Sequence, residues 1–197
     1  MMVIAIVGSY RKSGVTDRVV DEILSAGRKQ GAQTKKIFLT DKHIDFCKNC
    51  RSCTQLKDLK KGKCVISDEM DSILDEIKQA DALVIASPVN FGTMTAVMKK
   101  FYERLACYSC WPWGAKFPKK RDIQKNKRAV VVASSAAPGF FTRFFTKIVK
   151  HLKEIAKCLG AKKTSSLIVG SSAVKPNQKL KTKTRKKAGK LGRKLVI

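Results

Sequence analysis

The chain has 197 residues, of which 44% are hydrophobic, and this length and composition suit one α/β domain with a sizeable core. Its net charge of +27 favours anionic partners such as phosphates, nucleic acid, acidic proteins or anionic lipid headgroups. No apolar run is long enough to span a bilayer, so we expect a cytoplasmic protein whose seven cysteines are reduced thiols or metal ligands.

Apolar strand-like runs alternate with helical patterns along the whole chain. Strands are predicted at residues 2–7, 34–39, 82–86, 129–133 and 166–169. Helices are predicted at 16–30, after Asp68 with Met70, Ile73, Leu74 and Ile77 on one face, at 95–107, at 141–159, and at 177–197 as a basic terminal helix. This alternation predicts a flavodoxin-like three-layer sandwich, in which a five-stranded parallel sheet has the order 2-1-3-4-5.

Further details complete this single-domain prediction for residues 1–197. The helix at 141–159 is expected to turn inward Phe144, Phe145, Ile148, Leu152, Ile155 and Leu159. A cysteine-rich excursion occupies residues 46–64, and an irregular segment holds 108–121. The terminal helix has an apolar seam, so we expect it to pack on the sheet with a basic outer face.

The loop between the first strand and the first helix, residues 8–16, is rich in glycine, hydroxyl and basic residues. Ser9, Ser13 and Thr16, with the N–H groups that begin the next helix, can surround a phosphate dianion, and Arg11 and Lys12 add positive charge. The loop has neither the P-loop pattern nor the dinucleotide Gly-x-Gly-x-x-Gly pattern, which argues against an NTPase or an NAD-binding Rossmann domain. A plain strand-to-helix turn is the alternative.

A second loop, residues 87–93, follows the third strand. In the predicted strand order, ligands bind at the carboxyl ends of strands one and three, where the topology reverses. The loops at 8–16 and 87–93 leave those two ends, so we expect them to meet in one crevice.

The run Gly-Ser-Tyr-Arg-Lys-Ser-Gly-Val-Thr at 8–16 resembles the Gly-Ser-Pro-Arg-Lys-x-Gly-x-Thr loop of the NADPH-dependent FMN reductase and iron–sulfur flavoprotein family. The run Pro-Val-Asn-Phe-Gly-Thr at 88–93 resembles the isoalloxazine loop of that family, and the resemblance extends over nearly the whole chain. Tyr10 stands where proline is usual and Val15 where asparagine is frequent. Both departures bear on the phosphate contacts, and neither removes a backbone donor.

The resemblance implies three sets of FMN-binding residues. The phosphate would lie at Ser9, Arg11, Ser13, Gly14, Val15 and Thr16; the ring on Pro88, Val89, Asn90, Phe91, Gly92 and Thr93; and the other end of the ring under Ser134, Ser135 and Gly139. It implies an oxidoreductase in which NAD(P)H reduces FMN, which then passes electrons to a quinone, a small acceptor, a redox protein or an iron–sulfur centre. The flavin carries this chemistry, so no catalytic side chain is expected.

Four cysteines, Cys47, Cys50, Cys53 and Cys64, share the cysteine-rich excursion, and the first three have two-residue gaps. Such spacing lets thiolates face one centre, which suits a 4Fe–4S cluster, a structural zinc ion or free thiols. The resemblance favours the cluster, although the last gap of ten residues is longer than its relatives lead us to expect. Cys107 and Cys110 form a second pair, for which a redox-active role is the alternative, but we expect both of them and Cys158 to be packing residues.

Other features leave the function partly open. The only two histidines, His43 and His151, have no partner pattern of a hydrolytic triad. The Trp-Pro-Trp run at 111–113 suits a wall of the flavin site, a dimer interface or a loop anchor, and we expect a homodimer or homotetramer. One alternative is a flavin electron-transfer protein with a 4Fe–4S cluster and a ferredoxin-like donor. The other is a basic nucleic-acid-binding module, but no RNA or DNA motif supports it.

Overall fold

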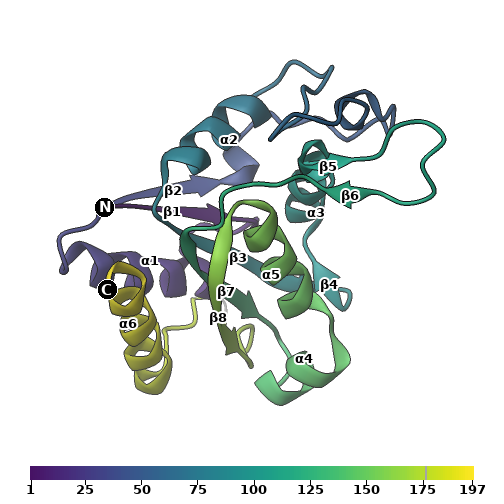
Figure 1. Cartoon of the computed structure of the whole chain (residues 1–197). Coiled ribbons are helices and arrows are strands. Elements are labelled where there is room, and N and C mark those ends of the chain that lie inside the picture. The colour runs from purple at the N-terminus through teal and green to yellow at the C-terminus, as the bar shows by residue number, and fades with distance from the viewer. Residues whose placement is uncertain (176) are drawn as a thin grey trace.

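The central sheet has five parallel strands, and the computed structural model describes residues 1–175 and 177–197 of the chain. Pro176, which falls within the predicted domain span, lies outside the described residues. The strands are β1 (Met2–Val7), β2 (Gln33–Phe38), β3 (Ala82–Asn90), β7 (Lys127–Ser134) and β8 (Ala161–Val169). Their order is β2-β1-β3-β7-β8, so the predicted order of five parallel strands is confirmed (Figure 1).

The strand β1 lies inside the sheet and pairs with β2 on one side and β3 on the other. Ile6, for example, lies opposite Ile37 and Ile85. Five of the six residues of β1 are buried, because helices cover both faces of the sheet. Its sequence therefore reads as a continuous apolar run, as is typical of a central parallel strand.

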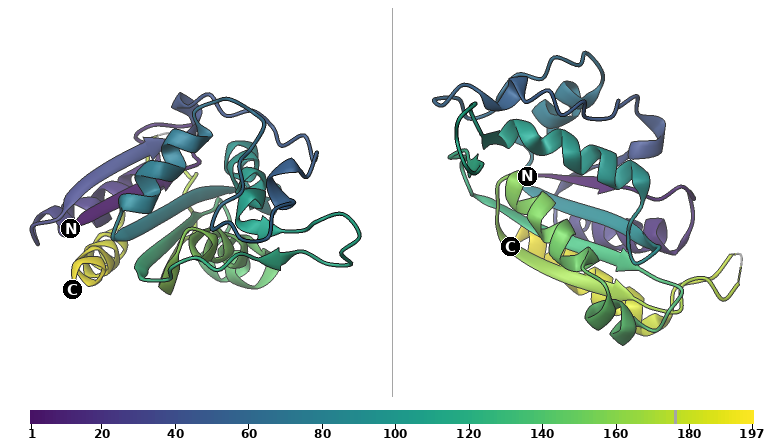
Figure 2. Two further views of the ribbon diagram at one scale, coloured as in Figure 1. Left: turned by 45° about the horizontal axis from the view of Figure 1, so that its top comes forward. Right: turned by 90° about the vertical axis from the view of Figure 1, so that its right-hand side faces the viewer.

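Helices form the two outer layers of the sandwich (Figures 1 and 2). One layer contains α2 (Met70–Gln79), α3 (Ala96–Arg104) and α5 (Ile148–Cys158), and the other contains α1 (Val15–Arg28) and α6 (Thr182–Val196). Met98, Phe101 and Leu152 are fully buried in the first core, and Val19 and Ile23 are buried in the second. The three-layer architecture is thus also confirmed.

The basic helix α6 lies side by side with α1 (Figures 1 and 2). Ala188 and Leu195 are buried, as the apolar seam predicts. Gly192 allows the close approach, since a Cβ atom there would lie 2.2 Å from the carbonyl oxygen of Ile23. Arg185 pairs with Glu22 at 2.8 Å across the contact.

The predicted single helix at 141–159 is wrong. The chain forms α4 (Gly139–Phe145) and then α5, separated at Thr146, whose backbone is extended at φ −126° and ψ 148°. The hydroxyl of Thr146 donates to the carbonyl of Thr142 at 2.6 Å, which closes α4 with a side chain instead of a glycine or proline. Phe144 and Phe145, predicted to face inward, are therefore 76% and 75% exposed.

Several other boundaries differ from the predictions. The third strand continues to Asn90 and pairs with β4 (Thr93–Met94) in a hairpin whose tip is Phe91 and Gly92. The fifth strand begins at residue 161, not 166. The irregular segment 108–121 contains a two-stranded ribbon, β5 (Ser109–Cys110) and β6 (Lys119–Lys120). Helix α3 ends at residue 104 and continues as a 3₁₀ turn, Leu105–Tyr108.

The cysteine-rich excursion lies between β2 and α2 and contains one short 3₁₀ helix, Ser52–Thr54. It lies beside the β5–β6 ribbon at one end of the molecule (Figures 1 and 2). None of the helices in the described part of the chain combines the length and apolarity that a bilayer crossing requires.

Candidate functional site

Loops from the carboxyl ends of β1, β3, β7 and β8 meet around one cavity of about 430 Å³. Its lining contains Ser9, Tyr10, Arg11, Gly14, Val15, Thr16, Pro88, Val89, Asn90, Ser134, Ser135, Ala136, Ser172 and Ala173. The loops after β1 and β3 thus meet in one crevice, as the strand order predicts, because parallel strands present their carboxyl ends at the same edge of the sheet.

The start of α1 faces this cavity with free backbone donors. Gly14 precedes the helix with an extended backbone, φ −72° and ψ 174°, and no side chain caps the first turn. The N–H groups of the first turn and the helix dipole therefore favour an anion. Arg11 is exposed at the cavity and forms no ion pair with any described residue. This end of the cavity is suited to a phosphate group.

Hydroxyl contacts fix the loops to one another. The hydroxyls of Thr16 and Ser134 lie 2.6 Å apart, and they join the start of α1 to the end of β7. The hydroxyl of Thr95 donates to the carbonyl of Gly8 at 2.6 Å. Gly8 is required there, since a Cβ atom would lie 2.7 Å from Cβ of Met98. The first loop is thereby held against the start of α3.

Five predicted site residues lie outside the cavity lining. Ser13 forms the turn before α1 at φ 60°, with its N–H donating to Asp17 at 2.7 Å. Phe91, Gly92 and Thr93 belong to the exposed end of the β3–β4 hairpin, and Phe91 is fully exposed. Gly139 begins α4 and packs against Gly170.

Four lining residues were missing from the predicted site: Tyr10, Ala136, Ser172 and Ala173. Ser172 is held in place because its hydroxyl donates to the carbonyl of Ser135 at 2.8 Å. A signal for Ser172 and Ala173 was present in the sequence, since they follow the fifth strand at the same sheet edge as the other loops. Tyr10 and Ala136 lie within two of the predicted loops.

Two of the four thiols of the cysteine-rich excursion, Cys53 and Cys50, have shifted pKa values. Burial raises the pKa of Cys53, and the charges of Cys64, Cys47 and Cys50 raise it further. The pKa of Cys50 is lowered, chiefly because the hydroxyl of Ser52 donates to its sulfur at 3.4 Å. In the described residues, no group of three or more Cys, His, Asp or Glu side chains is drawn together as a site for a metal ion.

Arg121, which sequence reasoning missed, anchors the cysteine-rich excursion. It is 6% exposed, and its guanidinium donates to the carbonyls of Leu56, Leu59, Cys53 and Cys107 at 2.7–3.2 Å, as well as to that of Lys57. Gly62 completes this packing, since a Cβ atom there would lie 1.7 Å from the carbonyl oxygen of Cys53. The excursion is thus ordered through its main chain.

Arg104 and Asp68 form a fully buried ion pair beneath the excursion. Burial raises the pKa of Asp68, but hydrogen bonds from Arg104 and from the N–H groups of Asp45 and Met70 outweigh it, so the net direction is downward. Burial lowers the pKa of Arg104, but the hydrogen bond to Asp68 and the charge of Cys64 outweigh this effect, so the pKa of Arg104 is raised. The Nε atom of Arg104 is buried with no partner in the described residues.

A third arginine, Arg51, lies between the two tryptophans of the β5–β6 ribbon. Its guanidinium carbon is 3.9 Å from the ring centre of Trp111 and 4.1 Å from that of Trp113. It also donates to the carbonyl of Trp111 at 2.7 Å. Of the three interpretations of the Trp-Pro-Trp run, the structure therefore supports a loop anchor, which joins the ribbon to the cysteine-rich excursion.

Of the three cysteines outside the excursion, Cys107 and Cys158 lie in or against the core, whereas Cys110 is half-buried in β5. Cys107 is buried in the first core, and burial raises its pKa to about 12. Cys158 is half-buried against the same core, and burial raises its pKa as well. Both therefore stay protonated at neutral pH, as packing residues do.

The strand order is that of a flavodoxin-like fold, and the cavity lies at its topological switch point. A family model described as NADPH-dependent FMN reductase matches residues 1–172, and the chain belongs to this family. The resemblance observed in the loop sequences is thereby confirmed.

Curated relatives of the chain are named iron–sulfur flavoproteins. An iron–sulfur flavoprotein of Methanocaldococcus jannaschii is 39% identical over 104 residues, which are 53% of this chain and 51% of the relative. One from Archaeoglobus fulgidus is 34% identical over 57% of this chain and 49% of the relative. The chain thus spans about half the length of the curated relatives it matches.

Solved structures share the fold. An FMN-dependent NADH-azoreductase from Bacillus anthracis, in complex with FMN, matches with a TM-score of 0.72 at 14% identity. The match covers 100% of this chain and 100% of the azoreductase chain. An NAD(P)H:quinone oxidoreductase from Methanothermobacter marburgensis has a TM-score of 0.66 at 16% identity, over 99% of this chain and 96% of its own.

Proposed function

We propose that the protein is an FMN-dependent oxidoreductase, in which NAD(P)H is the electron donor and a quinone, another small molecule or a redox protein is the acceptor. The observation that carries this proposal is the cavity at the switch point, with the uncapped start of α1 and the unpaired Arg11 at one end. Family membership and the names of the similar structures support it.

The cavity residues fit the parts of FMN. Ser9, Arg11 and the first N–H groups of α1 would hold the phosphate, because a dianion satisfies both the free donors and the arginine charge. Pro88, Val89 and Asn90 would form the wall beside the flavin ring, as an extension of β3 that β4 keeps rigid. FMN, when bound, supplies the hydride and electron transfer chemistry.

The chain's own contribution is binding and orientation. Ser134 and Ser135 fix the far side of the cavity through the bonds to Thr16 and Ser172. The cation at Arg11 and the chain's net charge of +27 favour the approach of an anionic nicotinamide cofactor. No general acid or base is needed among these residues.

An FMN titration of Arg11→Met tests the phosphate assignment. We expect roughly tenfold weaker FMN binding, because a charge-assisted contact is lost. The matched control is Lys12→Met, whose cation is already paired with Asp41 at 2.8 Å, and it should bind FMN almost as the wild type does. Wild-type protein that binds no FMN, or equal affinities for both variants, would refute the assignment.

We further propose that the cysteine-rich excursion holds a 4Fe–4S cluster through Cys47, Cys50, Cys53 and Cys64. Thiolates are the ligands such clusters require, and the two-residue gaps between the first three of these cysteines suit ligands of one centre. The names of the curated relatives support the same assignment. The described residues contain no preformed group of three or more metal-ligating side chains, so this proposal rests on the cysteine spacing and on the names of the relatives.

Iron and acid-labile sulfide analysis of anaerobically purified protein tests this assignment. Cys50→Ser should lose iron and keep the FMN absorption bands. Cys158→Ser, which alters a half-buried thiol outside the excursion, should keep both. Iron-free wild-type protein, or iron unchanged in Cys50→Ser, would exclude the cluster.

We also propose that the chain forms a homo-oligomer through α4. Phe140, Phe141, Phe144 and Phe145 are 59%, 44%, 76% and 75% exposed on this short helix, and such a contiguous apolar surface is typical of an interface. Sedimentation of the wild type should show a dimer or tetramer. Replacing Phe144 and Phe145 by Ser should shift the protein to monomer, whereas a monomeric wild type would exclude the idea.

A further inference from the structure

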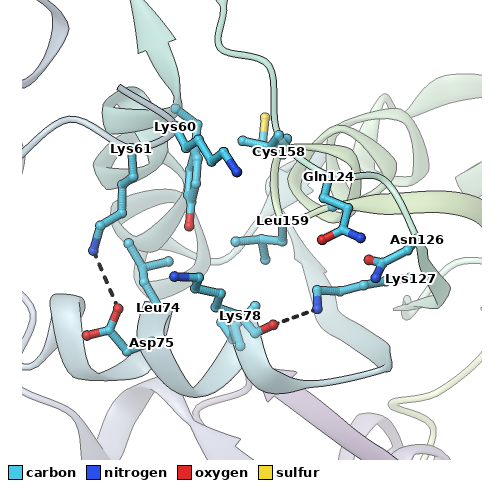
Figure 3. A pocket seen from close by; sticks show the side chains of 14 residues that line it. Lys60, Lys61, Leu74, Asp75, Lys78, Gln124, Asn126, Lys127, Cys158 and Leu159 are labelled. Atoms are coloured by element: carbon cyan, nitrogen blue, oxygen red, sulfur yellow. Dashed lines mark hydrogen bonds and ion pairs between the residues drawn. The ribbon is translucent and has the colours of Figure 1, made fainter. Parts of the chain in front are cut away.

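A second cavity, of about 230 Å³, is shown with its lining side chains in Figure 3. It lies at the opposite edge of the sheet from the cavity proposed to bind FMN, which we call the FMN cavity. Lys127 begins β7, Gly160 precedes β8 and Lys78 lies near the end of α2, so the cavity is at the amino ends of the strands. Nothing in the proposed FMN chemistry uses it.

Lys127 brings a buried positive charge to the wall of this cavity. The residue is only 8% exposed, and its ammonium donates to the carbonyls of Lys78, at 2.9 Å, and Ala80. These two bonds use two of its three N–H donors. Burial lowers the pKa of Lys127, although the charge of Asp81 partly opposes this effect, and Lys127 forms no ion pair with any residue in the described ranges. A buried ammonium without a carboxylate at ion-pair distance is costly, and an anion would offset that cost.

Three more lysines line the same cavity. Lys60 reaches over it from the cysteine-rich excursion, and Lys78 and Lys127 lie on the other side (Figure 3). Lys61 is paired with Asp71 at 2.9 Å and with Asp75 at 3.8 Å, whereas Lys60 and Lys78 have no ion-pair partner within residues 1–175 and 177–197. Lys61 and Asp75 therefore offset each other, and the lining keeps three ammonium groups without an ion-pair partner in the described residues, those of Lys60, Lys78 and Lys127, which repel one another unless an anion joins them.

The rest of the wall is apolar or neutral. Leu74, Ile77 and Leu159 are buried core residues that form an apolar surface facing the cavity, and Gln124 and Asn126 add neutral amide groups. A bare inorganic anion would leave this apolar surface in contact with water. The lining thus fits a molecule with a charged head and a small apolar body.

We propose that this cavity binds a small organic anion, a phosphate ester or carboxylate with a compact apolar body. The anionic group accepts hydrogen bonds from Lys127 and from Lys60 or Lys78, and the apolar body lies on Leu74, Ile77 and Leu159. Lys60 belongs to the cysteine-rich excursion, whereas Lys78 and Lys127 belong to α2 and β7. The bound anion therefore fastens the excursion to the sheet, and it does so without any contact with the FMN cavity.

Calorimetric titration with phenyl phosphate tests the proposal, with inorganic phosphate and phenol as the two partial probes. The wild type, saturated with FMN so that its phosphate loop is occupied, should bind one phenyl phosphate more tightly than either partial probe. The double variant Lys60→Met/Lys78→Met should bind it about tenfold more weakly, because the charge-assisted contact from Lys60 or Lys78 is lost and neither lysine can replace the other. The double variant Lys162→Met/Lys163→Met removes the same charge from exposed positions on β8 and should leave binding unchanged.

The titration also separates this site from the FMN site. Phenyl phosphate bound here remains bound in Arg11→Met, whereas phenyl phosphate at the α1 loop is lost in Arg11→Met and is displaced by FMN. Amide exchange in residues 56–62 should slow when the ligand binds. The proposal fails if no phenyl phosphate binds saturably, if inorganic phosphate binds equally well, or if both double variants lose affinity alike.

Discussion

The cavity proposed to bind FMN and the cysteine-rich excursion are ordered by opposite means. The cavity is formed by short loops at the ends of buried parallel strands, and hydroxyl contacts such as Thr16 to Ser134 join those loops. The excursion has one short 3₁₀ helix, and Arg51, Arg104 and Arg121 hold it in place. A site on a sheet edge thus inherits its rigidity from the core, whereas a long excursion needs dedicated anchoring side chains.

The largest effect is expected for Asp68→Asn, which breaks the buried ion pair beneath the excursion. The substitution leaves the buried Arg104 without its carboxylate, so at pH 7 the free energy of unfolding should fall by about 4 kcal/mol. The pKa of Asp68 is lower in the folded protein than in the unfolded chain. The stability that the ionised carboxylate contributes is therefore complete above the unfolded pKa of about 3.9, and it is lost as the pH falls through the folded pKa.

Urea unfolding between pH 7 and pH 3 measures both effects. The difference between wild type and Asp68→Asn should shrink as the pH falls below about 4. Asp58→Asn, at an exposed position of the excursion, is the matched control and should change stability little. A difference that stays constant across this range would contradict the role of the ion pair.

Arg121→Met removes the central anchor of the excursion itself. It leaves the carbonyls of Cys53, Leu56 and Leu59 to solvent, and we expect a loss of about 2 kcal/mol in the stability of this region. Amide exchange should accelerate in residues 53–62 and stay unchanged in β1 and β3. Lys120→Met, an exposed neighbour, is the control, and uniform acceleration throughout the chain would argue against a local anchor.

Thr16→Val acts on the FMN cavity and breaks its contact with Ser134. FMN should bind roughly tenfold more weakly, because the loops after β1 and β7 lose their connection. Iron content should not change, since the excursion depends on other contacts. Fluorescence titration with FMN gives the affinity, and an unchanged value would show that the hydroxyl pair does not shape the cavity.

The smallest expected effect comes from Gly92→Ala at the tip of the β3–β4 hairpin. Gly92 has φ 77° with nothing near its missing Cβ, so the cost of about 1 kcal/mol is purely conformational. Gly189→Ala, inside α6, should instead stabilise the protein by about 0.5–1 kcal/mol. Thermal unfolding shows whether each variant is more or less stable than the wild type. A Gly92→Ala variant that is more stable would contradict the strained conformation of the hairpin tip.

Much of the fold and of the FMN cavity follows from local sequence patterns. β1 is recognisable because burial on both faces requires a continuous apolar run, and its loop carries its own small and hydroxyl residues. The strand order then places the loops after β1 and β3 at one edge. Ser172 could have been predicted by the same reasoning, because it follows the strand β8.

The break at Thr146 and the arginine anchors were not predictable in this way. The apolar periodicity continues through Thr146 without glycine or proline, so the pattern alone favours one helix. Arg121 is one of 42 basic residues, and only the fold brings it to main-chain oxygens more than 60 residues away. Long-range contacts of this kind leave no mark on local composition.

Because Arg121 binds main-chain oxygens, which every amino acid carries, the side chains at 56, 57 and 59 are free to be exchanged without loss of the anchor. Insertion or deletion of a single residue there has the opposite effect, since it moves each oxygen out of reach of a planar guanidinium. The excursion is therefore tolerant of substitution and intolerant of changes in its length.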